Sequence, residues 1–216
     1  MPETILIHEN GILMKVDVMN GQKTGSFLDQ KANHLFVRPF CQGARVLDCF
    51  SYAGGFALNA AVAGAKSVTA VDISEQAVSL IAENAALNQV KVEAVCANCF
   101  DFLREKVREK QQYDVVVLDP PAFTKAHANM ASACRGYKEI ALSAMRLLPA
   151  GGVLATHSCS YHMPEETFMN TVFSAAQDLH RQVRVIAVRR QDEDHPVLAG
   201  HPESFYLKSL WLQMLA

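Results

Sequence analysis

The sequence has 216 residues, half of them hydrophobic, and a formal net charge of -2 at pH 7. A chain of this length can bury one substantial core but is too short for two ordinary enzyme domains. Charges interrupt its apolar stretches well before the roughly 20 residues that a membrane-spanning helix needs. The net charge excludes a global basic surface of the kind that nucleic-acid-binding domains often carry, and six scattered cysteines favour reduced thiols in a cytoplasmic protein.

The first residues have the pattern of a β-hairpin. Strands are predicted over residues 4–8 and 12–18. Asn10-Gly11 lies between them and readily adopts the positive φ angles of a tight turn. A polar, glycine-punctuated loop follows over residues 20–26.

A helix is expected after this loop. Asp29 can cap it, and it should run through Val37 and end before Pro39. We therefore predict an N-terminal extension of hairpin and helix over residues 1–40, followed by a catalytic domain over residues 41–216.

From Arg45 onward, short β-rich runs alternate with helical runs, the pattern of βαβ units and a parallel sheet. The predicted strands cover residues 45–49, 67–72, 91–96, 113–119, 151–158, 183–190 and 205–214. The predicted helices cover residues 56–63, 75–88, 100–110, 135–148 and 165–180, with Ser74 as the cap of the second. Because a loop rather than a helix joins the last two strands, we expect a Rossmann-like α/β fold whose seven-stranded, mostly parallel sheet has an antiparallel last strand.

The first two predicted strand ends form a candidate cofactor site. Asp48 ends one strand and precedes a small-residue turn with Gly54 and Gly55, where backbone can approach a bulky ligand without a Cβ clash. Asp72 ends the next strand, where its carboxylate can accept hydrogen bonds from both hydroxyls of a ribose or simply cap a helix. The Gly-x-Gly-x-x-Gly fingerprint is absent, which weakens the dinucleotide interpretation. NAD, another nucleotide and S-adenosylmethionine (SAM) all remain open.

Two further strand ends bring reactive groups to the same edge of the sheet. Asp119-Pro-Pro-Ala-Phe123 combines a carboxylate, a stiff backbone with exposed carbonyls and an aromatic ring, which suits holding a planar base. Cys159 follows the strand over residues 151–158, so its thiol should emerge beside the three aspartates. A free cysteine is most often an inert small hydrophobic residue, so this position is what favours a catalytic role.

No metal site is predicted. Cys96-Ala-Asn-Cys99 has the spacing of a zinc or redox pair. Neither a second such pair nor a matching pair of histidines accompanies it, and an apolar strand end explains it better.

Six motifs occur in one order along nearly the whole chain. They are Lys23-Thr24-Gly25-Ser26-Phe27-Leu28-Asp29-Gln30, the loop from Asp48 to Gly55, Asp119-Pro-Pro-Ala-Phe123, Ala133-Cys-Arg-Gly-Tyr137-Lys138, Ser158-Cys-Ser160 and His195-Pro196. In this order they resemble the bacterial 23S rRNA cytosine-C5 methyltransferase family. The resemblance implies a class I methyltransferase fold, SAM as cofactor, 23S rRNA as partner and a homodimer.

Two features depart from the pattern of that family. The family typically carries a PUA RNA-binding domain ahead of the hairpin, whereas this chain begins at the hairpin, as a shortened member or a truncated chain would. Asn98 stands where the family usually has an acidic residue near the adenine, although an amide can still make hydrogen bonds there.

The resemblance implies roles for individual residues. The expected cofactor-binding residues are Lys23, Thr24, Gly25, Phe27, Asp29, Asp48, Ser51, Tyr52, Gly54, Gly55, Phe56, Asp72, Ile73, Asn98, Cys99 and Asp119. The expected substrate-binding residues are Pro120, Phe123, Arg135 and Tyr137.

The implied chemistry is covalent. The Cys159 thiolate adds to carbon 6 of cytosine so that carbon 5 can attack the sulfonium methyl, while Asp119 holds the N3/N4 edge of the base. His157, His162 and the helix start near Pro164 are candidate sources of a lowered thiol pKa. The base that removes the carbon 5 proton is not identified, and the target nucleotide should be single-stranded or flipped.

Three other functions compete with this one. Asp119-Pro-Pro-Ala-Phe123 also resembles the Asp/Asn-Pro-Pro-aromatic motif of methyltransferases that act on exocyclic amines and need no thiol. A non-catalytic module that binds SAM or RNA would retain the fold without turnover. An NAD-dependent dehydrogenase fits the βαβ order but lacks the glycine fingerprint.

Overall fold

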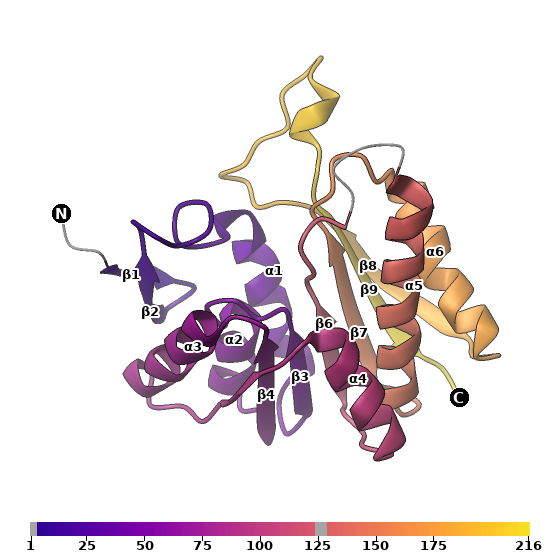
Figure 1. The fold of residues 1–216 in the computed structure, drawn as a ribbon, viewed down its shortest axis with the longest axis horizontal. Helices are drawn as coiled ribbons and strands as arrows, with labels where there is room; N and C mark the ends of the chain where they lie inside the picture. Colours follow the sequence, from indigo (N-terminus) through magenta and orange to yellow (C-terminus); the bar gives the residue numbers. More distant parts are fainter. Residues whose placement is uncertain (1–3, 124–128) are drawn as a thin grey trace.

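The computed structural model describes residues 4–123 and 129–216, which form one large sheet between two layers of helices (Figure 1). The seven strands lie in the order β5-β4-β3-β6-β7-β9-β8. Their bounds are β3 Arg45–Cys49, β4 Ser67–Asp72, β5 Glu93–Cys96, β6 Val115–Leu118, β7 Val153–Ser158, β8 Val183–Arg189 and β9 Lys208–Met214. Strands β3 to β7 pair in parallel, and β9 is antiparallel to both β7 and β8, as predicted.

The helices alternate with the strands as the sequence pattern predicts. Their bounds are α1 Lys31–Phe36, α2 Gly55–Val62, α3 Glu75–Leu87, α4 Cys99–Arg108, α5 Met130–Leu147 and α6 Glu165–Asp178. The predicted cap of α3 is confirmed, because the side chain of Ser74 accepts a hydrogen bond from the Ala77 backbone at 3.3 Å. Helix α5 begins at Met130 rather than Arg135, since its first turn buries Ala133 against the core.

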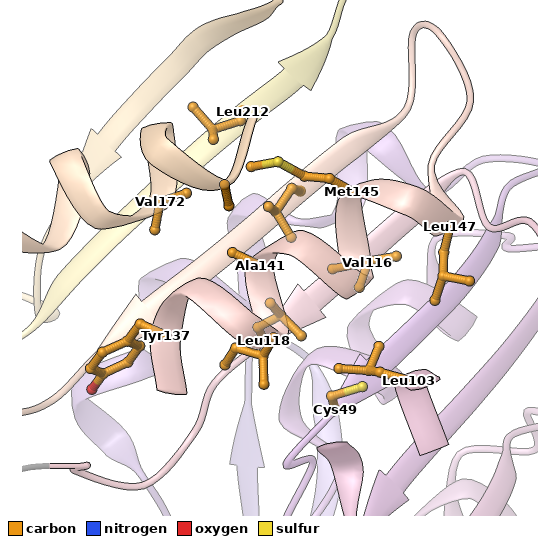
Figure 2. Packing of buried hydrophobic residues seen from close by; sticks show 14 of the residues in the cluster. Cys49, Leu103, Val116, Leu118, Tyr137, Ala141, Met145, Leu147, Val172 and Leu212 are labelled. Atoms are coloured by element: carbon orange, nitrogen blue, oxygen red, sulfur yellow. The ribbon is translucent and has the colours of Figure 1, made fainter. Parts of the chain in front are cut away.

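Each face of the sheet packs against its own helices because successive strand residues point to opposite faces. Leu47 joins the cluster beneath α4, α5 and α6, whereas Val46 joins the cluster beneath α1, α2 and α3. Figure 2 shows how side chains of α4, α5 and α6 meet those of the strands in the first cluster, among them Leu103, Tyr137, Val172, Val116 and Leu118. No helix within the described residues is both long and apolar enough to cross a lipid bilayer.

The N-terminal strands β1 Thr4–Glu9 and β2 Ile12–Asp17 form the predicted hairpin. Its turn has positive φ at Asn10 (53°) and Gly11 (77°). Asn84 of α3 and Asn88, the residue that follows this helix, bind the other edge of β2. Asn84 Oδ1 accepts from the Lys15 backbone at 2.7 Å, and Asn88 Oδ1 accepts from the Leu13 backbone at 2.9 Å. These amides satisfy backbone donors that an edge strand would otherwise leave open, and they attach the hairpin to the end of α3.

The prediction that Asp29 caps a helix is wrong. A 3₁₀ turn at Leu28–Gln30 precedes α1, and the Asp29 carboxylate is buried and accepts side-chain hydrogen bonds instead. A buried carboxylate with side-chain donors gains more from those donors than from a helix end, which neighbouring backbone already satisfies.

His157 of β7 lies wholly inside the sheet core. Its ring stacks on Phe56 with centroids 4.9 Å apart and meets the Trp211 ring edge-on at 5.9 Å. Burial lowers the pKa of this imidazole to about 3 from an ordinary value of 6.5. The folded protein therefore holds a neutral histidine where the unfolded chain would bind a proton.

We expect this burial to make the protein sensitive to acid. Because the folded-state pKa is the lower one, the unfolded state binds more protons as the pH falls below 6.5, and stability is lost down to pH 3. At pH 5 the loss from this group is about 2 kcal/mol. The measurement is urea unfolding at pH 7.5 and at pH 5. Between these pH values, the free energy of unfolding should fall by about 2 kcal/mol less in His157→Leu than in the wild type. An identical pH dependence in both proteins would contradict the assignment.

Candidate cofactor and catalytic site

A cavity of about 480 Å³ lies at the carboxyl ends of β3, β4, β6 and β7, where open α/β sheets bind their ligands. Loops after these strands form its floor. Residues of the N-terminal segment, most of them polar, form the opposite wall, namely Asp17, Asn20, Gly21, Gln22, Ser26, Phe27, Asp29, Gln30 and His34. The cavity is therefore completed by residues far from the strand ends in sequence.

Most of the predicted site residues line this cavity. Those that do are Phe27, Asp29, Ser51, Tyr52, Phe56, Asp72, Ile73, Asn98, Cys99, Asp119, Pro120, Phe123 and Cys159. Those that do not are Lys23, Thr24, Gly25, Asp48, Gly54, Gly55, Arg135 and Tyr137. The second group is placed behind or beside the wall, and several of its members have structural partners there.

Asp48 organises the first strand-to-helix loop from behind. It has no exposed surface, and its Oδ2 accepts hydrogen bonds from Ser51 Oγ at 2.5 Å and from the Ala57 backbone at 3.0 Å. Burial raises its pKa to about 6. The prediction that Asp48 touches the cofactor is therefore not supported by its place in the structure; it shapes the loop that does.

Asp72 reaches the cavity and also joins two loops. One carboxylate oxygen accepts from the Tyr52 backbone at 2.9 Å, and the other accepts from the Ser74 backbone at 3.0 Å. Each oxygen can accept a second hydrogen bond, so the carboxylate can still bind a ribose from the cavity side. Both interpretations of Asp72, loop anchor and ligand acceptor, are thus compatible with the geometry.

Gly54 and Gly55 serve two different purposes. Gly54 adopts a left-handed φ of 89°, which starts α2. Gly55 lies against the imidazole of His34, where an added Cβ would stand 2.5 Å from Nε2. His34 lines the cavity, and its Nδ1 lies 2.7 Å from the buried Glu9 carboxylate.

Asn98 and Cys99 close the cavity at the start of α4. Asn98 caps this helix, because its Oδ1 accepts from the Phe100 backbone at 2.9 Å, and its amide nitrogen remains available to a ligand. The Cys99 sulfur accepts from the Phe50 backbone at 3.2 Å. Cys96 is exposed, and within the described ranges no group of three or more His, Cys, Asp or Glu side chains could hold a metal ion.

Asp29 is the hub of the N-terminal wall. Its Oδ2 accepts from Lys23 Nζ at 2.7 Å and from the Tyr206 hydroxyl at 2.8 Å. Lys23 Nζ also lies 4.6 Å from the centre of the Phe27 ring. Gly25 is required nearby because its φ is +86° and an added Cβ would lie 2.9 Å from the Asp17 carbonyl carbon. The Lys-Thr-Gly motif therefore builds this wall rather than lining it.

Asp119 and Cys159 share the floor of the cavity. Burial raises the pKa of Asp119 to about 7, an effect that the nearby His34 opposes. Burial, and then the charge of Asp119, raise the pKa of the Cys159 thiol to about 11, while Lys23 lowers it. At neutral pH, Asp119 is thus available as both proton donor and acceptor, and Cys159 is a thiol that requires further stabilisation to ionise.

Tyr137 supports the Cys159 loop from beneath. The tyrosine is 1% exposed, and its hydroxyl hydrogen-bonds with Ser158 Oγ at 2.8 Å and Ser160 Oγ at 3.3 Å. Its ring lies 4.6 Å from that of Phe123, which does reach the cavity. A direct contact of Tyr137 with substrate is therefore incompatible with its burial, and Arg135, on the exposed face of α5, lies outside the cavity.

His157 does not assist Cys159. Alternate residues of β7 point to opposite faces, so its imidazole lies in the core with Phe56 and Trp211. The sequence did not predict His34 and Gln30, which line the cavity, or Glu9, which contacts His34. Gln30 belongs to the Lys23–Gln30 motif, whereas His34 and Glu9 have no sequence signal beyond their residue type.

The donors and acceptors in the cavity fit SAM. Within residues 4–123 and 129–216, the buried Asp29 Oδ1 and Gln30 Nε2 have no hydrogen-bond partner, so one acceptor and one donor remain for the amino and carboxylate groups of a methionine moiety. Asp72 is placed for a ribose, and Ile73 and Phe100 offer apolar surface for a base. Fold and site together define a class I methyltransferase.

Comparison with known proteins agrees. Residues 2–194 match the family model of the S-adenosylmethionine-dependent methyltransferases, and the chain belongs to this family, whose cofactor is SAM. It is 42% identical over 211 residues to a protein of Aeromonas salmonicida and 41% identical over 210 residues to one of Citrobacter koseri, both named ribosomal RNA large subunit methyltransferase I. The alignments cover 96% of this chain and 53% of each relative, so the chain spans about half the length of these relatives.

Solved structures share the fold. A protein of Streptococcus mutans, itself proposed to be a SAM-dependent methyltransferase, superposes with a TM-score of 0.88 at 24% identity, over 99% of this chain and 56% of that one. A SAM-dependent methyltransferase of Agrobacterium tumefaciens superposes with a TM-score of 0.72 at 18% identity, over 100% of this chain and 71% of that one.

We expect Asp72→Ala to weaken SAM binding about 10- to 100-fold, because one or two hydrogen bonds to a charged group are lost. Isothermal titration calorimetry with SAM measures the effect. The SAM affinity of Asp72→Asn, which keeps one acceptor, should lie between those of the wild type and Asp72→Ala. The affinity of Asp101→Ala, on the exposed face of α4, should match that of the wild type. An unchanged affinity in Asp72→Ala would reduce Asp72 to a loop anchor.

Proposed function

We propose that this chain methylates carbon 5 of a cytosine in 23S rRNA, in the cytoplasm, through a covalent bond to Cys159. The observation that carries the proposal is that Cys159, Asp119 and Asp72 line one cavity. The likeness to ribosomal RNA large subunit methyltransferases supports RNA as the substrate. The six cysteines are all unpaired, which suits a thiol nucleophile in a reducing compartment.

Bound SAM supplies an electrophilic methyl group on a sulfonium. Asp119 recognises the cytosine edge, accepting from the N4 amine and, when protonated, donating to N3. With a pKa of about 7 the carboxyl holds this proton about half the time at neutral pH. A protonated Asp119 no longer opposes ionisation of Cys159, so binding of the base favours the thiolate.

The thiolate sulfur then bonds to carbon 6, and the electron pair of the 5,6 double bond becomes available at carbon 5. There it would bond to the methyl carbon while the bond from that carbon to the sulfonium sulfur breaks, and the sulfur would keep that electron pair as a neutral thioether. Loss of the carbon 5 proton restores the double bond and expels the thiolate. Phe123 and Pro120 line the cavity beside Asp119 and can hold the flipped ring on its face. Tyr137 holds the loop that carries the sulfur through Ser158 and Ser160.

The test is to map methylated nucleosides in 23S rRNA from cells with and without the gene, by nuclease digestion and mass spectrometry. Loss of one 5-methylcytidine, restored by the gene on a plasmid, is the expected result. Loss of a methylated exocyclic amine would replace this reaction with the alternative that the Asp-Pro-Pro-Ala-Phe motif permits. No change in any nucleoside would overturn the proposal for 23S rRNA.

A further inference from the structure

Lys208 is a buried cation beside the nucleophile loop, Ser158 to Ser160, which carries Cys159. It begins β9 and is 3% exposed, a burial that lysine almost never reaches without a partner. Its Nζ donates to the Ser160 carbonyl at 2.5 Å and to the Tyr206 carbonyl at 2.8 Å. In the part of the chain that the structure describes, no carboxylate forms an ion pair with it.

The two hydrogen bonds connect Lys208 to the backbone on both sides of the site. In the antiparallel ladder between β7 and β9, Lys208 stands directly opposite Ser158. Its ammonium then reaches past that residue to the carbonyl of Ser160. Cys159 therefore lies between one residue paired with Lys208 through the ladder and another bound by its ammonium.

A buried ammonium that only carbonyls solvate is costly, because two dipoles do not replace a counter-ion. Burial lowers the pKa of Lys208 to about 8, while negative charges on Cys159 and Glu165 act to raise it. Such interactions are reciprocal: an anion that stabilises the ammonium is stabilised by it. The anion that the proposed reaction requires at this place is the Cys159 thiolate.

We propose that Lys208 is a positioning residue for Cys159. The Lys208 ammonium orients the nucleophile loop through the Ser160 carbonyl and serves as the counter-charge of the Cys159 thiolate. This inference rests on the proposed role of Cys159. It also answers how a buried thiol beside Asp119 comes to ionise.

Other charged groups also influence the pKa values of Lys208 and Cys159. Asp119 at the end of β6 and Asp29 of the N-terminal wall raise the pKa of the Cys159 thiol, and Lys23 lowers it. Tyr137 and Tyr206, from α5 and the segment before β9, also interact with Cys159 when they are ionised. Glu165, at the start of α6, is the other group that acts on Lys208. None of these groups is substituted in a Lys208 variant, so the ionisable groups that remain around the thiol are the same.

The test measures the thiol directly, without RNA or SAM. Iodoacetamide alkylates the thiolate, forming a carbon-sulfur bond and releasing iodide, and peptide mass spectrometry follows Cys159 separately from pH 6 to pH 10.5. We expect Lys208→Met to alkylate about tenfold more slowly at pH 7.5, which is the effect of raising the thiol pKa by about one unit. Lys208→Arg should restore most of the rate, and the exposed Cys96 should react equally in all variants.

An unchanged Cys159 profile in folded Lys208→Met would overturn the inference, even if RNA methylation fell. Should Lys208→Met not fold, Lys208→Gln decides, because its amide can still donate to the Ser160 carbonyl but carries no charge. Its Cys159 should be alkylated as slowly as that of Lys208→Met is expected to be, and a wild-type rate would refute the counter-charge. Since neither experiment uses RNA, failure here is separable from failure of the nucleoside mapping.

Discussion

Replacing Cys159 by alanine is expected to lower the rate of RNA methylation at least about a thousandfold, because carbon 5 of cytosine is a poor nucleophile until a thiolate adds at carbon 6. The measurement is transfer of labelled methyl from SAM to unmodified 23S rRNA. Cysteine content itself is controlled by Cys96→Ala, which removes an exposed thiol and should leave the rate unchanged. Binding of SAM should change less than about threefold, since no hydrogen bond from the thiol to the cofactor is needed.

The same variant separates the two methylation chemistries. RNA transcribed with 5-fluorocytidine cannot release a proton from carbon 5, so the wild type should stay bonded to it as a complex that survives denaturing electrophoresis. Cys159→Ala should form none. Full activity of Cys159→Ala would remove the covalent scheme and leave methylation of an amine, for which Asp119-Pro-Pro-Ala-Phe123 is sufficient.

Gly55→Ala is expected to lower the free energy of unfolding by about 2 kcal/mol, the cost of forcing a methyl group into a packed site. The new Cβ would stand 2.5 Å from Nε2 and 2.8 Å from Nδ1 of His34. The imidazole cannot easily retreat, since Glu9 holds Nδ1 and the ring meets Phe56 edge-on with centroids 4.6 Å apart. Urea unfolding measures the loss, and SAM affinity should fall with it because His34 lines the cavity.

His34→Ala provides the matched control for this clash. In the double variant the imidazole is gone, so adding Gly55→Ala to His34→Ala should cost under about 0.5 kcal/mol. Equal costs of Gly55→Ala in both backgrounds would show that the glycine is needed for its backbone and not for the close approach of His34.

The N-terminal wall of the cavity depends on contacts between residues that are far apart in the sequence. Lys23 and Gly25 belong to a motif that resemblance assigns to cofactor binding, yet they hold Asp29 and the adjoining loop in place. Tyr206, 177 residues further along the chain, binds the same Asp29 oxygen. The C-terminal segment and the N-terminal loop thus meet at the site. A contact between residues so far apart in the sequence cannot be predicted from the local spacing of residues.

The residue pattern by itself determined the order of helices and strands, the antiparallel last strand, and the appearance of Asp72, Asp119 and Cys159 at one edge of the sheet. It could do so because strand and helix periods are local and because the carboxyl ends of parallel strands always share an edge. Only the tertiary structure decided that Asp48 and Tyr137 point away from the cavity, that His34 pairs with Glu9, and that Lys208 binds the Ser160 carbonyl. His34 and Glu9 are 25 positions apart in the sequence, and Lys208 and Ser160 are 48 positions apart. Packing of the whole chain brings these partners together, so neighbouring residues in the sequence do not reveal them.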